Sequence, residues 1–268
     1  DALPISWVVY KLSGRLFADR RLQWIFCFGV MYLPESMFVH TYVNSDSTNL
    51  LSVAIIVYAW VRAYQDGFDA RVSLTLALGI ILCALSYYNA YGFILSSILL
   101  FFGFYLKKEE GRIIYDWRNM LKWGVYISVV VLLGIGWWFL RAYIVLDGDF
   151  LGLRTRTQMA VQYAVPEANP LYRVTYQSQG LSLIQMLRET DFWGMTLNTF
   201  IAAFGSLSIV GNRWIYRFYK LYFAGTFLTC LILPEKKSSP PGMEKGRRIF
   251  FHVNMIFCII IVFALMVV

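Results

Sequence analysis

Three polar residues of types that take part in chemistry lie close together at His40, Asn44 and Asp46. They belong to the segment HTYVNSDSTNLLS, residues 40–52, which separates two strongly apolar runs. Imidazole and carboxylate groups transfer protons in many enzymes. Ionisable groups at membrane depth are costly unless they face a bundle interior or a water-filled cavity. If the helix continues through this point, His40 and Asn44 are neighbours at i and i+4 and line one wall, with Asp46 at the rim.

The same segment has a simpler interpretation as the start of a helix. Ser45, Asp46 or Ser47 would cap a helix that begins near Thr48, by accepting hydrogen bonds from its first backbone N–H groups. Capping does not account for His40. The two interpretations are compatible, because one side chain can both cap a helix and contact a substrate.

The composition indicates a membrane as the main solvent. Of the 268 residues, 59% are hydrophobic, 18% aromatic and only 15% charged, and the mean hydropathy is +0.57. A water-soluble domain of this length needs more polar surface, so a multi-span membrane protein is predicted. The net charge is +8, and the excess basic residues lie in short loops that flank apolar runs. Retention of positive charge on the cytoplasmic side and attraction to anionic lipids explain this excess, so nucleic acid is excluded as a partner.

Apolar runs predict an all-α fold, a polytopic transmembrane bundle of about eight spans with a long external loop that contains amphipathic helices. The first run is about half a span long, so we expect the chain to be a fragment of a longer protein. The predicted organisation is 1–143 for spans one to six, 144–211 for the external loop and 212–268 for spans seven and eight. The runs are 2–12, 23–42, 48–64, 72–88, 91–106, 121–143, 212–233 and 249–268.

Basic residues fix the expected orientation, because Lys and Arg are retained on the cytoplasmic side. Four alternate segments hold four, two, five and five of the 24 basic residues and are assigned to the inside: 11–21, 62–71, 107–122 and 236–248. The short segments 43–47 and 89–90 hold none and face outside, together with the long segment 141–213.

The long segment contains one further apolar stretch, FWGMTLNTFIAAFGSLSIVG at 192–211, which is long enough to span. A crossing there would put the basic segment 235–248 outside, so we predict an external surface helix with Thr190 or Asp191 near its start. The preceding LSLIQMLRETDF has the spacing of an amphipathic helix.

Several motifs resemble one class of membrane enzymes. The run 13–60 contains Arg15-Leu16-Phe17, Arg20-Arg21, Pro34 and Asp46, in the order of a basic inner loop, an apolar span, a proline and an external aspartate that opens the next helix. This run is similar to the second membrane section of the GT-C glycosyltransferases, which include protein O-mannosyltransferases and lipid A aminoarabinose transferases. ALSYYNAYGFIL takes the place of a Lys-Tyr hairpin, and TFIAAFG at 199–205 resembles another element of bacterial relatives.

The resemblance implies an inverting transferase that moves a sugar from a polyprenyl-phosphate donor to a glycan, lipid or protein acceptor on the outer face. Asp46 matches the second external acidic position, where a carboxylate orients acceptor, donor sugar or a metal, so a divalent cation is a possible cofactor. The principal catalytic acid of the class is expected upstream of Asp1. Asn89 stands where many relatives have a phosphate-binding Lys. Arg154 and Arg156, with Arg141 and Arg173, are external cations for the lipid phosphate.

Other interpretations remain open. Tyr88 is expected to bind substrate together with His40, Asn44 and Asn89. Tyrosines are also frequent at membrane–water interfaces, which is an alternative explanation for Tyr88. A transporter or flippase would account for buried polar groups, and a scaffold without chemistry would tolerate substitution of them. No P-loop, GxGxxG, HExxH or serine-hydrolase motif is present. A multi-pass protein of a bacterial plasma membrane is the expected setting.

Overall fold

The computed structural model describes residues 2–41, 44–86, 88–109, 112–172, 174, 178–205, 209–232 and 245–267. It consists of two compact units. The first unit comprises Asp1–Gly134 and Arg217–Val268, and the second comprises Ile135–Tyr216. The described residues are mostly helical, which confirms the all-α prediction.

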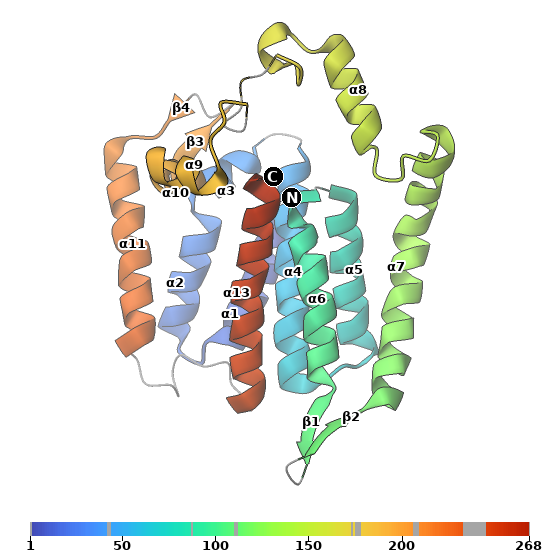
Figure 1. Cartoon of the computed structure of the whole chain (residues 1–268). Helices are drawn as coiled ribbons and strands as arrows, with labels where there is room; N and C mark the ends of the chain where they lie inside the picture. Colours follow the sequence, from blue (N-terminus) through green and yellow to red (C-terminus); the bar gives the residue numbers. More distant parts are fainter. Residues whose placement is uncertain are drawn as a thin grey trace. The chain divides into compact units, whose positions relative to one another are not determined.

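Seven of the eight predicted apolar runs overlap one α-helix each, and the run 23–42 overlaps two (Figure 1). In the first unit, a 3-10 turn η1 and a two-stranded antiparallel hairpin accompany the helices, and α7 and α11 continue into the second unit. The elements are α1 (Ala2–Leu16), α2 (Arg20–Met31), α3 (Pro34–Val39), α4 (Ser45–Asp66), α5 (Ala70–Ser86), η1 (Tyr88–Ala90), α6 (Tyr91–Phe104), β1 (Leu106–Glu109), β2 (Arg112–Tyr115), α7 (Trp117–Val145), α11 (Arg213–Ile232) and α13 (Lys245–Val267).

The predicted single helix over 23–42 is wrong, because the chain breaks between α2 and α3. Tyr32 ends α2, and Leu33 adopts φ −59° and ψ 123° directly before Pro34, which is the first residue of α3. Proline has no backbone N–H and its ring disfavours a helical residue before it. Pro34 therefore starts a new short helix rather than continuing the old one.

The turns of the first unit gather at two opposite ends of its helices (Figure 1). One end holds the α1–α2 and α4–α5 turns, the β1–β2 hairpin and the start of α13. We call it the basic end, because Arg15, Arg20, Arg62, Arg71 and Arg247 lie in or next to these turns. The other end, called the polar end, holds the α3–α4 turn and η1.

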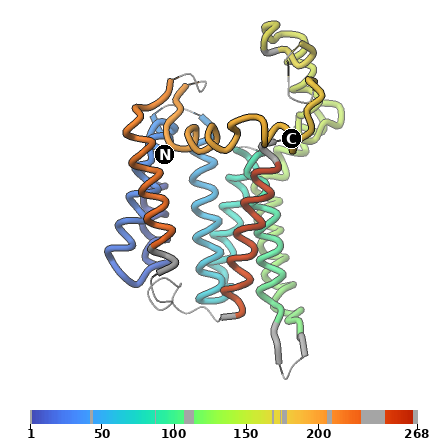
Figure 2. Tube along the Cα trace, turned by 60° about the vertical axis from the view of Figure 1, so that its left-hand side comes forward, coloured from blue at the N-terminus to red at the C-terminus, as the bar shows by residue number. Residues whose placement is uncertain are grey.

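The core of the first unit lies where α4 packs against α1, α5 and α6, and α6 packs against α13. Figures 1 and 2 both show α4, α6 and α13 running side by side. Trp60 on α4 is 2% exposed and donates its indole N–H to Ser97 Oγ on α6 at 3.0 Å. Tyr64 on α4 donates to the Leu100 carbonyl of α6 at 2.9 Å.

Besides large apolar side chains such as Trp60, Ile56 and Leu100, this interior contains small and polar side chains. Ser52, Ser73 and Ser96 are each 0% exposed. At Gly79 of α5, an added Cβ would lie 2.8 Å from Ile56 Cγ1 on α4, so only glycine permits this close approach. Small residues at helix contacts and hydroxyl groups between helices are typical of membrane bundles.

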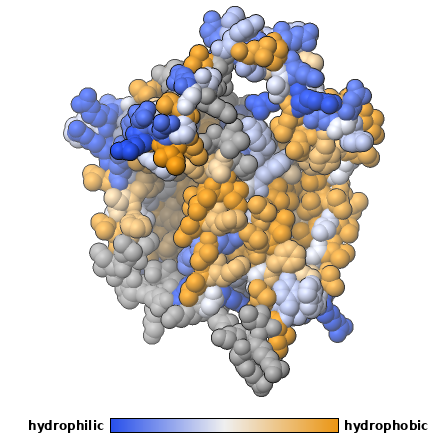
Figure 3. All heavy atoms as spheres, viewed as in Figure 1, coloured by the Kyte–Doolittle hydropathy of each residue, from blue (hydrophilic) through white to orange (hydrophobic). Residues whose placement is uncertain are grey.

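The outward faces of the same helices are strongly apolar. Leu132 and Leu133 on α7 are 65% and 77% exposed, and Ile259 on α13 is 63% exposed. Figure 3 shows apolar side chains covering the helices of the first unit on the visible face. Large exposed apolar surfaces mark contact with a membrane or another protein.

Two described helices are long and apolar enough to cross a membrane, Trp117–Val145 and Gly246–Ala264. Shorter apolar helices occur at Ala70–Ser86 and Tyr88–Phe104. By length and composition, the described residues thus support two of the eight predicted spans. The predicted span over 23–42 differs most from the structure, because α2 and α3 are each shorter than the ~20 residues that a helix needs to cross a bilayer.

The second unit contains short helices connected by turns. They are α8 (Leu153–Tyr163), η2 (Pro166–Ala168), α9 (Leu183–Glu189), α10 (Phe192–Ala202), β3 (Ala203–Phe204) and β4 (Ile209–Val210). Asp191 caps α10 by accepting from the Gly194 N–H, as predicted, and α10 is only 11 residues long. The chain turns at Gly205, where φ is +65°, so the stretch 192–211 does not form a spanning helix.

Candidate functional site

The polar end of the first unit contains five of the predicted site residues. Asn44, Asp46 and His40 flank the α3–α4 turn, and Tyr88 and Asn89 form η1. A hydrogen bond from Ser86 Oγ to Asn49 Oδ1 at 3.4 Å links the end of α5 to the first turns of α4. The structure therefore brings segments 40–49 and 86–90 to one end of the same helical unit.

Asn44 is the residue that caps α4. Its Oδ1 accepts from the Ser47 N–H at 2.9 Å, and its Nδ2 donates to the Val39 carbonyl at 3.4 Å. The predicted caps Ser45, Asp46 and Ser47 are wrong by one to three residues, because α4 begins at Ser45 rather than near Thr48. Asn44 has the extended backbone of a cap residue, with φ −149° and ψ 168°.

His40 ends α3, and the predicted i, i+4 wall with Asn44 is wrong. The chain leaves the helix after Val39, so His40 and Asn44 cap two different helices instead of sharing one face. The His40 ring is half-buried, and its Nδ1 is buried without a hydrogen-bond partner in the described chain. Burial lowers the pKa of His40, which favours a neutral imidazole at pH 7.

Asp46 lies exposed in the first turn of α4. A carboxylate is stabilised there, because the N-terminus of a helix carries a partial positive charge. Since Asn44 already supplies the cap, the Asp46 carboxylate is not needed for that role. Its position at the polar end leaves it accessible to a polar molecule.

Asn89 and Tyr88 form the second part of this polar end. Asn89 is half-buried, and its Oδ1 is buried with no hydrogen-bond partner among the residues described. Tyr88 is 39% exposed. A buried acceptor without a partner costs free energy, so such an atom is explained when a ligand or water supplies the missing donor.

The predicted phosphate-binding arginines Arg154 and Arg156 belong to the second unit, on α8. Arg154 Nη2 donates to the Asp147 carbonyl at 3.2 Å, and the Arg156 N–H donates to the Gly152 carbonyl. A hydrogen bond from the Thr155 N–H lowers the pKa of Asp149 at the start of this helix. Both arginine side chains are exposed on α8, and Arg173 lies outside the described residues.

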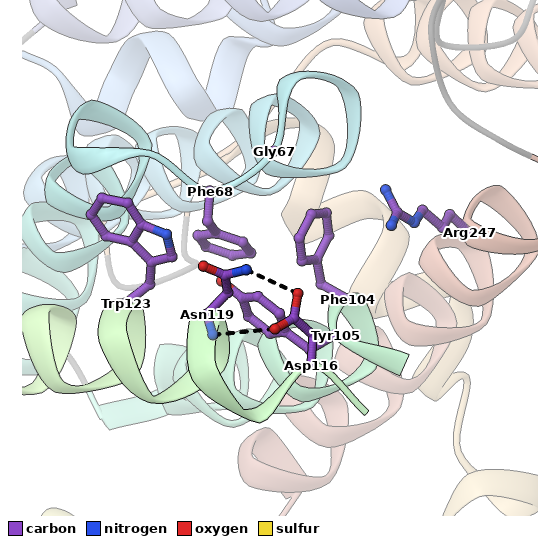
Figure 4. A pocket seen from close by; sticks show the side chains of 8 residues that line it. All are labelled: Gly67, Phe68, Phe104, Tyr105, Asp116, Asn119, Trp123 and Arg247. Atoms are coloured by element: carbon purple, nitrogen blue, oxygen red, sulfur yellow. Dashed lines mark hydrogen bonds between the residues drawn. The ribbon is translucent and has the colours of Figure 1, made fainter. Parts of the chain in front are cut away.

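The basic end contains a cavity that the sequence did not indicate. Its volume is about 290 Å³, and its walls come from the α4–α5 turn, the end of α6, the start of α7 and the start of α13. Figure 4 shows the side chains that line it. They are Phe68, Phe104, Tyr105, Asp116, Asn119, Trp123 and Arg247, with the backbone of Gly67.

No cluster of three His, Cys, Asp or Glu side chains suited to a metal ion occurs within the described ranges. A divalent cation at the polar end would therefore take most of its oxygen ligands from substrate and water, with Asp46 as the protein carboxylate. No protein-family model matches this chain, and neither a curated protein nor a solved structure matches it.

Proposed function

We propose that this chain is part of a multi-pass membrane glycosyltransferase that uses a polyprenyl-phosphate sugar donor at its polar end. The proposal has two parts, a membrane setting for the first unit and a substrate site at residues 40–46 and 88–89. The two parts rest on different observations.

The membrane setting is supported by the distribution of side chains in the first unit. Many outward side chains are large and apolar, such as Leu132, Leu133 and Ile259, while buried serines and Gly79 lie between the helices. Water favours polar side chains on the outside of a protein, whereas lipid solvates apolar side chains there. Two long apolar helices add to this support, and we propose that α1, the broken α2–α3 pair, α4, α5, α6 and α11 cross the same bilayer.

The orientation follows from the two ends. The turns with most basic residues gather at the basic end, and the polar end carries none in its α3–α4 turn or in η1. Because Lys and Arg are retained inside, we propose that the polar end faces the outer side of the membrane. A bacterial plasma membrane is the proposed location.

The observation that carries the substrate site is a pair of buried polar atoms without partners at the polar end. His40 Nδ1 and Asn89 Oδ1 lack hydrogen bonds within the described chain. The same end carries an exposed carboxylate, Asp46, which the fold does not need as a helix cap. A hydroxyl-rich sugar supplies both donors and acceptors, so it would satisfy these atoms.

In the proposed reaction, Asp46 orients the acceptor or the donor sugar, alone or through a divalent cation. His40 and Asn89 hold sugar hydroxyl groups, Asn44 fixes the turn, and Tyr88 offers an apolar face to the sugar. GT-C proteins carry their principal acid on an earlier external loop, so Asp46 is given a substrate-orienting role.

The test uses the full-length protein, purified in detergent and returned to vesicles of mixed phospholipids. The probes are radiolabelled polyprenyl-phosphate hexoses and pentoses, with cell-envelope material as acceptor. We expect Asp46→Asn to lower label transfer by at least about tenfold, because it removes a charge that orients the reacting groups. Asp69→Asn is the matched control, since Asp69 is also exposed at a helix start, where it accepts from the Val72 N–H.

Two results would count against the proposal. Transfer that is equal in wild type and Asp46→Asn removes Asp46 from the site. Label that crosses the vesicle membrane without reaching any acceptor would support a transporter or flippase instead.

A further inference from the structure

The cavity at the basic end has an aromatic wall built from three parts of the chain. The ring centroid of Phe68, in the α4–α5 turn, lies 5.0 Å from that of Phe104 and 5.9 Å from that of Tyr105. Trp123 from α7 lines the same cavity. Several rings in mutual contact present π faces and edges in a fixed arrangement, and such faces attract organic cations.

Groups of both charges line this cavity. The Arg247 guanidinium lies 4.6 Å from the Phe104 ring centroid, which holds it against the aromatic wall. Asp116 accepts from Asn119 Nδ2 at 3.0 Å and from the Asn119 N–H at 3.3 Å (Figure 4). These bonds orient its carboxylate at the start of α7.

Tyr105 gives an independent sign that something binds here. This residue is 3% exposed, and its hydroxyl is buried without a hydrogen-bond partner in the described part of the chain. The tyrosine lines the cavity together with Asp116. A buried hydroxyl without a partner is costly, so a polar ligand in the cavity would recover that cost.

The charges narrow the ligand to one class. A simple anion would be repelled by Asp116 and a simple cation by Arg247, whereas a molecule with both charges would be attracted by both groups. A primary ammonium suits a carboxylate and aromatic faces, and a phosphate suits a guanidinium. The volume of about 290 Å³ is at the lower end of small-molecule sites, which suits a headgroup better than a large metabolite.

A lipid is favoured over a soluble molecule by the surface next to the cavity. The start of α7 contributes Trp123 to the cavity and carries exposed Leu121, Val125 and Val129, which are 56%, 59% and 48% exposed. These three residues are spaced by four and form one stripe on the outer side of α7, away from Trp123. The helix that lines the cavity thus presents apolar side chains to its surroundings, so a ligand with acyl chains would meet an apolar environment here.

We propose that the cavity at the basic end binds the headgroup of a zwitterionic phospholipid, with its phosphate on Arg247 and its ammonium at Asp116 and the aromatic wall. Tyr105 donates its hydroxyl hydrogen to a phosphate or ester oxygen. This inference rests on the membrane setting proposed above, and it is independent of glycosyl transfer.

The test measures lipid retention by the full-length protein in detergent micelles, with native mass spectrometry as the readout. The probes are phosphatidylethanolamine, phosphatidylglycerol and free phosphoethanolamine. We expect one phosphatidylethanolamine to be retained about tenfold better than phosphatidylglycerol, and we expect about tenfold weaker retention in Arg247→Gln and Asp116→Asn. Asp116→Asn keeps the acceptor oxygen at the start of α7, so it changes the charge with little effect on the helix.

Controls and contrary outcomes are defined by the same experiment. Asp69→Asn and Arg71→Gln change exposed residues at the basic end outside the cavity and should retain phosphatidylethanolamine as wild type does. Tyr105→Phe separates the hydroxyl from the ring and should weaken retention without loss of the fold. Equal retention of the two lipids, unchanged retention in the variants, or full competition by free phosphoethanolamine would each overturn the inference.

The outcome is separable from that of the transferase proposal. The cavity residues lie at the opposite end of the first unit from Asp46, so their variants should transfer sugar as wild type does. If the protein transfers sugar but does not select phosphatidylethanolamine, the lipid-site inference is refuted and the transferase proposal stands. If it selects phosphatidylethanolamine but transfers no sugar in any assay, the transferase proposal is refuted and the lipid-site inference stands.

Discussion

Replacing Asn44 tests whether Asn44, and not Asp46, is the residue that caps α4 at the polar end. Asn44→Ala removes the oxygen that accepts the Ser47 N–H at 2.9 Å. Ser47 is 1% exposed, so water has little access to replace the lost bond. Loss of an N-cap costs about 0.5–2 kcal/mol, and the burial of Ser47 places this variant in the upper half of that range.

Two further variants make the comparison quantitative. Asn44→Asp keeps the acceptor and adds a negative charge at a helix N-terminus, but it loses the 3.4 Å hydrogen bond to the Val39 carbonyl, so its stability should lie within ~0.5 kcal/mol of wild type. Asp46→Asn loses only the interaction of an exposed carboxylate with the helix dipole, which is worth about 0.3–0.5 kcal/mol. We expect wild type, Asn44→Asp and Asp46→Asn to have similar stabilities and Asn44→Ala to be well below them.

The assay is reversible unfolding of the full-length protein by SDS in mixed micelles, followed by far-UV circular dichroism. Free energies of unfolding from the three variants and wild type are compared at one micelle composition. An Asp46→Asn variant as unstable as Asn44→Ala would refute the reasoning, because Asp46 would then be needed for the helix. In that case, a loss of sugar transfer in Asp46→Asn would be explained by a less stable fold rather than by a role of Asp46 in the reaction.

Three other predictions address the packing and titration of the first unit. The indole N–H of Trp60 bonds Ser97 at 3.0 Å, so a double-mutant cycle with Trp60→Phe and Ser97→Ala should give a coupling of about 0.6 kcal/mol, at most ~1.7, and zero coupling would deny the bond. Gly79→Leu should cost about 1–3 kcal/mol in the same SDS assay, because its Cβ would lie 2.8 Å from a neighbouring side chain, whereas Gly14→Leu, with nothing within 4 Å, should cost nothing. Burial lowers the pKa of His40 in the folded protein below its ordinary value of about 6.5. The free energy of unfolding should therefore be highest above pH 6.5 and should decrease as the pH falls from there through the pKa of the folded state. His40→Gln removes the titrating group and should make the free energy of unfolding depend less on pH in this acidic range.

Local patterns in the sequence determined which segments are helical. Apolar runs with few charges exclude most alternatives to a helix at these lengths, so seven of the eight predicted runs overlap one α-helix each, and the run 23–42 overlaps both α2 and α3. The cap of α10 was also local, because an aspartate before an apolar run satisfies the first N–H groups wherever the helix finally packs. The concentration of basic residues in alternate turns was readable in the same way.

The ends of the helices were decided by interactions that composition does not rank. Asn44, Ser45, Asp46 and Ser47 are all acceptable caps, and the choice depends on where the backbone leaves α3. The backbone leaves α3 after Val39, whose carbonyl accepts from Asn44 Nδ2 at 3.4 Å, so His40 and Asn44 fall outside the helix. The predicted shared face of His40 and Asn44 was lost for this reason.

The cavity at the basic end could not be found in the sequence at all. Its lining residues come from four segments between Gly67 and Arg247, and none of these segments has a motif of its own. The packing of α4, α6, α7 and α13 brings an arginine, an aspartate and a buried tyrosine hydroxyl to the same small volume. Helix formation depends on neighbours along the chain, whereas a binding site depends on neighbours in space, and only the tertiary structure decides which residues those are.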